Sequence, residues 1–255
     1  MATADDNPQQ QGLKKGLFHV PLSGICGLLS AGLALGSLHP QVLRANPSGG
    51  SVAAGTAGIS SHGSTLTITQ GSNRAIINWQ DFSISAGETT RFIQPSSSSA
   101  MLNRVIGGNP SQIHGRLQAN GQVYLINPNG ILVGPGGVVD TGGFLASTLD
   151  LSDDEFLRGG DLRFSGSSNA SVINLGSIGA SEGDVILIAR TVENQGEIRA
   201  TNGTAVLAAG SEVLVKASGE DRVFIEAGKG SVTNKGLIEG AAAEIKAAGG
   251  NEYAL

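Results

Sequence analysis

Side chains able to carry out catalysis are few in this sequence, and its acidic groups are scattered. Four carboxylates in the apolar, Gly-rich part of the chain illustrate this: Asp140, Asp161, Asp184 and Asp221. Chemistry on a sugar chain requires carboxylates that lie together, often with Arg or Lys beside them to stabilise developing charge. Because none of the four recurs in step with another, we predict that the protein is not an enzyme. A polysaccharide-active enzyme is kept as an alternative function.

A denser acidic group could instead hold a metal ion: Asp150, Asp153, Asp154 and Glu155. The spacing Ser152-x-x-Glu155 before an apolar pair is that of a capping box at the start of a short helix. A calcium loop would need glycine among regularly spaced Asp residues, and none is present here. We therefore favour the helix start over a calcium site.

Neither of the two histidines that follow residue 45 has a neighbour in the sequence that suggests catalysis or metal binding. His62 and His114 lie among polar residues and glycines, without an acid or nucleophile at a recognisable spacing. The segment Gly134-Pro135-Gly136-Gly137 lacks the Lys-Ser/Thr pair that completes a phosphate-binding loop. The sequence predicts no metal site and no cofactor.

Composition indicates a turn-rich β protein. The chain has 255 residues, of which 39 are Gly, 15% are charged and 4% are aromatic. Ordinary soluble domains carry about 25% charged residues and about 7% Gly. The formal net charge is −5, and no basic stripe is apparent, so nucleic acid is not expected as a partner.

The first 45 residues have the pattern of a secretory signal peptide with an extended n-region. Lys14-Lys15 precede a largely apolar stretch, Leu17–Leu38, and Ala45 offers a small residue at the cut. We expect the mature chain to begin near Asn46. Removal of the signal peptide would take away Cys26, which is the single cysteine, so no disulfide is expected.

A polar tetrapeptide, Asn127-Pro128-Asn129-Gly130, interrupts two apolar runs. Tyr124-Leu125-Ile126 precedes it and Ile131-Leu132-Val133 follows it. Asn-Pro begins turns and Asn-Gly tolerates positive φ, so the four residues can bend a strand sharply. The sequence predicts a tight corner between two buried strands.

A repeat of about 20 residues follows. Three segments share Val-x-Asn-x-Gly-x-Ile, and their Asn and Gly positions are Asn174 and Gly176, Asn194 and Gly196, and Asn234 and Gly236. Alternation places the apolar residues inside and the Asn and Gly at a corner, as expected for a parallel β-helix. We expect a degenerate middle copy near Leu214, an irregular excursion over Ala217–Gly230, and on the order of ten coils in all. A β-propeller built from double units is the alternative.

The region 46–110 shows no clear 20-residue register and is expected to form an N-terminal β cap. It contains short strands and the aromatic residues Trp79, Phe82 and Phe92, which could plug the core. Residues 111–255 are expected to form the coils.

Five blocks of residues in the same order resemble the N-terminal secretion domain of filamentous-haemagglutinin-like exoproteins, the cargo of two-partner secretion systems. Asn78, Trp79 and Phe82 match its first block, and Asn103 and Arg104 match the second. Ile113-His114-Gly115-Arg116-Leu117 also belongs to the second block, and the remaining three blocks are the signature turn Asn127–Gly130, Phe144–Thr148 and Ser152–Phe156. The nearest counterpart of the family's second, Asn-Pro-Asn-Leu turn is Asn109-Pro110.

The resemblance implies a right-handed parallel β-helix over 46–255 that directs secretion. After export to the periplasm, the domain would bind the POTRA domains of a cognate outer-membrane β-barrel transporter in a Gram-negative bacterium, through Asn127–Gly130. Folding at the cell surface would then proceed from the cap. A monomer, secreted or held at the surface, is expected. Adhesion to host or neighbouring cells, or a contact-dependent toxin activity, would reside in a downstream region.

Overall fold

The computed structural model describes residues 46–219 and 221–248. The expected signal peptide, residues 1–45, lies outside the described residues and stays a prediction. In the part that is described, no helix is long and apolar enough to cross a membrane.

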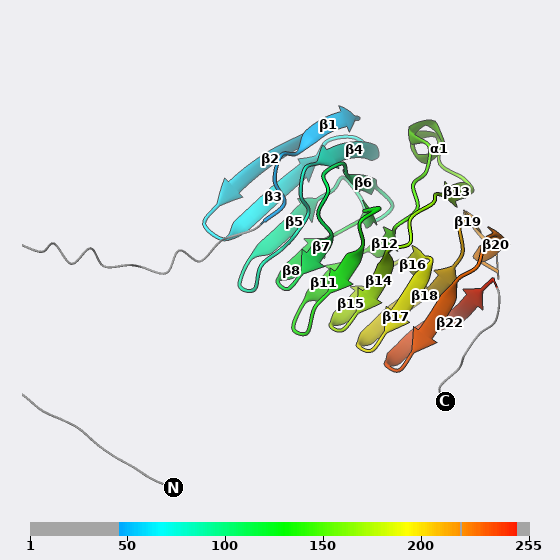
Figure 1. Ribbon diagram of the computed structural model, residues 1–255. Coiled ribbons are helices and arrows are strands. Elements are labelled where there is room, and N and C mark those ends of the chain that lie inside the picture. The colour runs from blue at the N-terminus through cyan, green and yellow to red at the C-terminus, as the bar shows by residue number, and fades with distance from the viewer. Residues whose placement is uncertain (1–45, 220, 249–255) are drawn as a thin grey trace, which may run out of the picture. The chain divides into compact units, whose positions relative to one another are not determined.

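Most strands pair in parallel and form the three faces of a helix around one core. Figure 1 shows these strands stacked from the cyan end to the red end. The first face contains β4 (Arg74–Trp79), β6 (Ala100–Val105), β9 (Gln122–Ile126), β12 (Gly143–Ser147), β16 (Val185–Ala189) and the second halves of β18 (Glu197–Ala209) and β22 (Leu237–Ala247). The second face contains β3 (Thr65–Gln70), β5 (Thr89–Ile93), β8 (Arg116–Ala119), β11 (Val138–Thr141), β15 (Ser177–Ala180) and the first halves of β18 and β22. The third face contains β7 (Ser111–Ile113), β10 (Ile131–Val133), β14 (Ser171–Asn174), β17 (Thr191–Asn194) and β21 (Ser231–Asn234).

The chain passes from the first face to the third and then to the second in each coil, so the expected parallel β-helix is confirmed. β18 and β22 bend from the second face into the first without ending, and a register shift between Ala200 and Thr204 marks this bend in β18.

The expected number of coils was wrong. Asn194 pairs directly with Asn234 in the next coil, although 40 residues separate them. The segment around Leu214 is β19 (Glu212–Val215), and it leaves the helix instead of forming a middle copy. The first face therefore holds seven parallel strands, because two long excursions, 148–170 and 210–230, consume length without adding coils.

The excursions fold back onto the first face. They contribute α1 (Asp153–Arg158) and an antiparallel sheet of β13 (Leu162–Ser165), β19 and β20 (Val223–Ala227). Phe156, Phe164 and Val213 are fully buried against outward-facing residues of the first face such as Ile76 and Leu102. Both sides of this face are thus apolar and buried, as is usual for parallel strands that are covered on both faces.

Two antiparallel strands cover the N-terminal end of the helix. β1 (Ser51–Ala54) pairs with β4, and β2 (Ala57–His62) pairs with β3. The remaining strands of the 46–110 region, β3 to β6, already pair in parallel with the coils. The antiparallel cover thus consists of β1 and β2.

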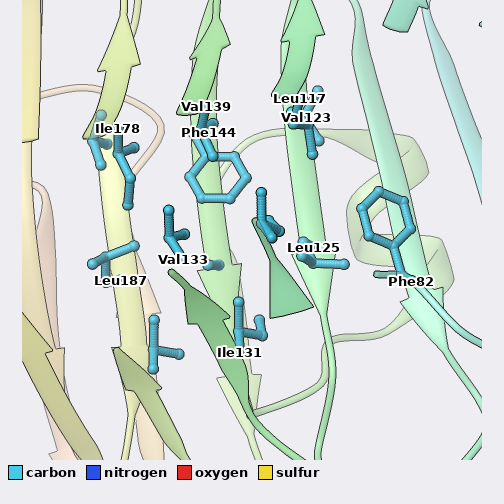
Figure 2. Packing of buried hydrophobic residues seen from close by; sticks show 14 of the residues in the cluster. Phe82, Leu117, Val123, Leu125, Ile131, Val133, Val139, Phe144, Ile178 and Leu187 are labelled. Atoms are coloured by element: carbon cyan, nitrogen blue, oxygen red, sulfur yellow. The ribbon is translucent and has the colours of Figure 1, made fainter. Parts of the chain in front are cut away.

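Alternate residues of each face point into one continuous core, as Figure 2 shows for Leu117, Val123, Val139 and Phe144. The large core side chains Trp79, Phe82 and Phe92 lie near the cap. Toward the C-terminus the core becomes richer in a smaller side chain, at Ala180, Ala189, Ala200, Ala205 and Ala209. Core side-chain volume therefore decreases along the helix.

Candidate functional site

The tetrapeptide Asn127–Gly130 forms the corner between β9 on the first face and β10 on the third. The N–H of Gly130 donates to the carbonyl oxygen of Asn127 at 3.0 Å, which closes a four-residue turn. Gly130 has a φ of +112°, a conformation that residues with a Cβ rarely adopt. The polar sequence between two apolar strands is therefore explained by the backbone it must form.

The side chain of Asn127 is fully buried and makes hydrogen bonds in two directions. Its amide donates to the carbonyl oxygen of Asn109 and to the hydroxyl of Ser111, both at 2.9 Å. Its carbonyl oxygen accepts from the main-chain N–H of Asn129 at 2.9 Å and from the Asn129 amide at 3.1 Å. All of these partners belong to the protein itself, so Asn127 holds the corner and does not face a ligand.

Pro128 and Asn129 are the exposed half of the corner. The Asn129 amide donates to the carbonyl oxygen of Gly107 in the preceding coil at 2.8 Å. The carbonyl oxygen of Pro128 accepts from the hydroxyl of Ser168, in the first excursion, at 2.6 Å. The Asn129 side chain is thus held by the preceding coil and the Pro128 main chain by the first excursion, while the Pro128 ring faces solvent.

Asn109-Pro110 occupies the corresponding corner of the preceding coil. Ser111 pairs with Ile131, so Pro110 lies beside Gly130, and Asn109 is the acceptor for Asn127. The Asn109 amide reaches the carboxylate of Asp81 at 3.4 Å. Two Asn-Pro segments therefore meet at one edge of the helix, offset by two residues.

The residues of the first two family blocks lie on β4 and β6, or just after them. The Trp79 indole N–H donates to the Asn103 side-chain oxygen at 3.0 Å, and Phe82 packs edge-on against Trp79 at 5.7 Å between ring centroids. Asn78 lies on the opposite side of β4, where its side-chain oxygen is buried and has no hydrogen-bond partner among the described residues. These residues support the cap end of the core.

Arg104 connects the first face to the first excursion. Its guanidinium contacts Asp150 at 2.9 Å and Asp153 at 2.6 Å, and donates to the carbonyl oxygen of Leu151 at 2.9 Å. Burial disfavours its charge, but the hydrogen bonds and charges of Asp153 and Asp150 outweigh this, so the pKa of Arg104 is raised. Two members of the acidic group therefore neutralise an arginine.

The helix expected after Ser152 forms as α1, with its acidic residues in the first turn. The Ser152 side chain makes no capping hydrogen bond, so the part of the expected capping box that Ser152 would supply is wrong. In the described ranges no cluster of His, Cys, Asp or Glu could hold a metal ion.

The repeat asparagines form a ladder inside the third face. The Asn174 amide donates to the Asn194 side-chain oxygen at 2.8 Å, and the Asn194 amide donates to Asn234 at 2.7 Å. The glycines two residues later stack closely, since a Cβ on Gly196 would lie 2.1 Å from the carbonyl oxygen of Gly176. Gly236 has the same relation to Gly196, at 2.0 Å.

The scattered carboxylates do not converge on one site. Asp184 pairs with Arg222 at 2.7 Å, and Asp161 and Asp221 pair with lysines. Asp140 is exposed on β11. His62 is exposed in β2, and the His114 ring lies over Gly134 and within 3.3 Å of the Gln112 side-chain oxygen.

Sequence reasoning missed three residues that hold these sites: Asn46, Ser111 and Ser168. Each is a short polar residue whose partner lies in another coil. Only the stacking register identifies them, because no local pattern distinguishes them from other Ser and Asn residues.

Together these features define a capped, three-sided parallel β-helix whose distinctive polar residues stack coils and shape one corner. A family model described as the TPS secretion domain matches residues 43–254, and the chain belongs to this family.

Similar proteins come from Haemophilus influenzae. One heme/hemopexin-binding protein is 36% identical over 222 residues, which is 81% of this chain and 24% of that protein. A second protein of the same description is 49% identical over 86 residues, 34% of this chain and 9% of that protein. The chain thus spans at most about a quarter of the length of these curated relatives.

Two solved structures share the fold. The HMW1 secretion domain from Haemophilus influenzae matches with a TM-score of 0.69 and 31% identity, covering 79% of this chain and 57% of that one. The filamentous hemagglutinin secretion domain matches with a TM-score of 0.52 and 14% identity, covering 79% and 98%. The second likeness concerns the fold alone.

Proposed function

We propose that this β-helix is the secretion-targeting domain of a larger exported protein. Residues 1–45 direct the chain into the periplasm, where POTRA domains of a cognate outer-membrane β-barrel transporter bind residues 46–255. The protein then leaves a Gram-negative cell and is released or stays at the surface. Membership in the TPS family and the relatives' greater length support this role.

The observation that carries the proposal is that Asn127 and Gly130 of the corner are buried, whereas Pro128 and Asn129 are exposed. Asn127 is hydrogen-bonded within the protein. Ser168 holds Pro128 through the Pro128 carbonyl oxygen, and Gly107 holds Asn129 through the Asn129 side-chain amide. A rigid, exposed ring loses little conformational entropy on binding. We assign the contact with the transporter to Pro128 and Asn129 and the shape of the corner to Asn127 and Gly130.

The gradient of core volume supports folding from the cap. Each added coil is stabilised chiefly by the coil before it, so a well-packed first coil is the natural nucleus. Trp79, Phe82 and Phe92 supply that packing near β1 and β2. Coil-by-coil folding outside the cell would then oppose return of the chain through the transporter.

The isolated mature domain is proposed to be monomeric. Adhesive or toxic activities of the exported protein are assigned to regions other than this domain, since the match covers only 24% of the heme/hemopexin-binding protein. The alternative of a polysaccharide-active enzyme gains no support from the carboxylates described above, three of which are ion-paired.

The test compares two prolines on one coil. Pro128 and Pro135 are both exposed at corners that flank β10, but only Pro128 belongs to the proposed contact. Pro128→Ala is expected to reduce export and binding to the purified POTRA domains at least about fivefold, with unchanged thermal stability. Pro135→Ala is the control and is expected to behave as the unmodified chain. Normal export and binding of Pro128→Ala would refute a recognition role for this residue.

A further inference from the structure

A cavity of about 460 Å³ lies between the outer side of the first face and the antiparallel sheet of the excursions. Its volume falls within the range of about 300–1,000 Å³ that is usual for small-molecule sites. Leu145 and Ile186 of the first face line one side, and Leu162 of β13 and Val215 of β19 line the other. None of the residues that we assign to transporter contact lines this cavity, so the proposed function leaves it without a role.

The register of the first face places polar groups around an apolar floor. Gln122 pairs with Gly143 in the neighbouring strand, and Leu145 pairs with Ile186 two residues further along. Asp184 follows in the next coil and lies beside Gly143. Because Gly143 carries no side chain, the space between Gln122 and Asp184 remains open. The cavity thus combines an apolar floor with a few polar groups, as ligand sites commonly do.

Arg74 supplies a positive charge for which no carboxylate partner is found among the described residues. Its guanidinium donates to the carbonyl oxygen of Phe156 at 2.8 Å and lies 5.2 Å from the centre of the Phe156 ring. Arg74 is half-buried and lines the cavity. A guanidinium has five N–H donors, and the Phe156 carbonyl oxygen accepts from one nitrogen. The side chain is therefore held in place while donors remain for an anion.

Tyr124 presents a second donor close to Arg74. Its ring packs edge-on against the same Phe156, at 5.3 Å between ring centroids, so Phe156 positions both residues. Burial raises the pKa of the Tyr124 hydroxyl, and the charges of Arg74, Asp184 and Arg222 act on it as well. The hydroxyl thus keeps its proton at neutral pH, and among the described residues it has no hydrogen-bond partner. A neutral hydroxyl beside a guanidinium forms a donor pair suited to a carboxylate.

Hydrogen-bond acceptors line the rest of the cavity. The Asp184 carboxylate pairs with Arg222 at 2.7 Å and accepts from the N–H of Thr204 at 2.8 Å. A carboxylate has about four acceptor sites, so Asp184 retains capacity for further donors. The Gln122 amide and the exposed carboxylate of Glu182 also line the cavity. These groups suit hydroxyl groups, and the two carboxylates oppose a second negative charge on a ligand.

We propose that this cavity binds a small carboxylate that also carries hydroxyl groups, such as an acidic sugar. The carboxylate lies against Arg74 and Tyr124, and the hydroxyl groups bond Gln122 and Asp184. The carbon atoms of the sugar ring lie over the apolar floor. An acidic sugar can be a free molecule or the end of a polysaccharide, and the recognised chemistry is the same in both.

This site goes beyond the proposed function and does not depend on it. Both walls exist only when the excursions are packed on the first face, so the site acts in the folded domain, outside the cell. Gln122 begins β9, whereas Pro128 and Asn129 follow the end of that strand. The cavity and the proposed transporter contact therefore lie at opposite ends of β9.

Isothermal titration calorimetry of the mature chain with D-glucuronate tests the site. Glucuronate is expected to bind at least about tenfold more tightly than D-glucose, which lacks the carboxylate. It is also expected to bind more tightly than glucose 6-phosphate, whose second negative charge is opposed by Asp184 and Glu182. A hyaluronan tetrasaccharide with glucuronate at its non-reducing end distinguishes the two sources. Tighter binding of the tetrasaccharide identifies a polysaccharide end, and equal or weaker binding identifies the free acid.

Two variants test the assignment of the carboxylate. Arg74→Gln is expected to weaken glucuronate binding at least about tenfold, because a charge-assisted hydrogen bond is lost. Tyr124→Phe removes only the hydroxyl and is expected to weaken binding about three- to tenfold. Arg116→Gln is the matched control with unchanged binding, because Arg116 is an exposed arginine of β8 on the second face. Circular dichroism and melting temperatures are measured first, and Tyr124→Phe decides should Arg74→Gln be misfolded.

The outcomes separate this inference from the proposed function. Absence of glucuronate binding at about 10 mM overturns the inference, and so does binding that Arg74→Gln and Tyr124→Phe leave unchanged. Equal or tighter binding of glucose 6-phosphate overturns the assignment to a carboxylate. All of these measurements are made without the transporter, so their failure leaves the secretion role intact. Normal export of Pro128→Ala, conversely, has no bearing on the cavity.

Discussion

The indole N–H of Trp79 and the side-chain oxygen of Asn103 lie 3.0 Å apart inside the helix, on adjacent strands β4 and β6. Asn103 is fully buried, and its amide donates onward to the carbonyl oxygen of Tyr124 in β9 at 3.3 Å. One side chain therefore connects three successive coils at the cap end.

Replacing Asn103 by Leu leaves the Trp79 N–H buried without a partner. The free energy of unfolding is expected to fall by about 1–3 kcal/mol, which is the usual cost of an unsatisfied buried donor. Urea unfolding followed by the fluorescence of the single Trp measures this directly. Asn169→Leu, at an exposed position, is the control, and its expected change is within about 0.5 kcal/mol. Equal effects at the two sites would contradict the role of the buried hydrogen bond.

Arg104→Ala should loosen the first excursion. Its guanidinium is largely buried and bonded to Asp150, Asp153 and the Leu151 carbonyl oxygen. A loss of about 1–2 kcal/mol is expected, together with faster proteolysis within 148–170. Arg163→Ala removes exposed pairs with Glu212 and Glu226, and is expected to cost at most about 0.5 kcal/mol. Unchanged proteolysis in Arg104→Ala would show that the excursion is held by its apolar contacts alone.

The asparagine ladder predicts unequal costs along the third face. Asn194 bonds both Asn174 and Asn234, so Asn194→Ala breaks two side-chain contacts and is expected to lower stability by about 1–3 kcal/mol. Asn234→Ala breaks only the contact with Asn194, and is expected to cost on the order of 1 kcal/mol. Chemical denaturation of both variants tests this order, and a larger cost at Asn234 would reverse it.

Tyr124 predicts a loss of stability in alkali. Burial raises the pKa of its hydroxyl, and the charges of Arg74, Asp184 and Arg222 modify this only secondarily. Because the pKa is higher in the folded state, the stabilisation is complete below the unfolded value of about 10 and is lost as the pH rises through the folded value.

Stability is therefore expected to fall as the pH rises above about 10, and less steeply in Tyr124→Phe. Thermal melts of both proteins from pH 7 upward, referred to their values at pH 7, make the comparison. Identical slopes would exclude Tyr124 as the titrating group.

The corner, the alternating strands and the parallel β-helix could be predicted from the sequence, because each depends on residues close together in the chain. The residues Asn127–Gly130 by themselves indicate a turn. The Asn-x-Gly repeat indicates that coils stack at the 20-residue separation seen between Asn174 and Asn194. The first excursion could not be predicted, and the second was expected only over Ala217–Gly230, whereas it begins at residue 210. Leu214 lies in an apolar run, Val213–Val215, of the kind that a coil strand contains, and only pairing with β13 and β20 shows otherwise.

The tertiary partners of the family residues were equally hidden. Arg104 and Asp150 are 46 residues apart, and Asn127 and Asn109 are 18 apart, and neither spacing matches the repeat. At the start of the described chain, the Asn46 side chain binds Ser64 and Thr90, and the antiparallel pairing of Ser48 with Asp81 does not continue. Such competition between alternative partners is decided by the folded geometry.

The corner between the first and third faces holds the tetrapeptide Asn127–Gly130 in one coil, a long excursion in the next, the single residue Arg190 in the one after, and a second excursion after that. The same edge of the prism thus tolerates one residue or more than twenty while the strands on either side keep their register. The two long connections both lie at this edge. A reporter peptide or epitope inserted at Arg190 would therefore lie at an edge of the helix where neighbouring coils already carry long insertions.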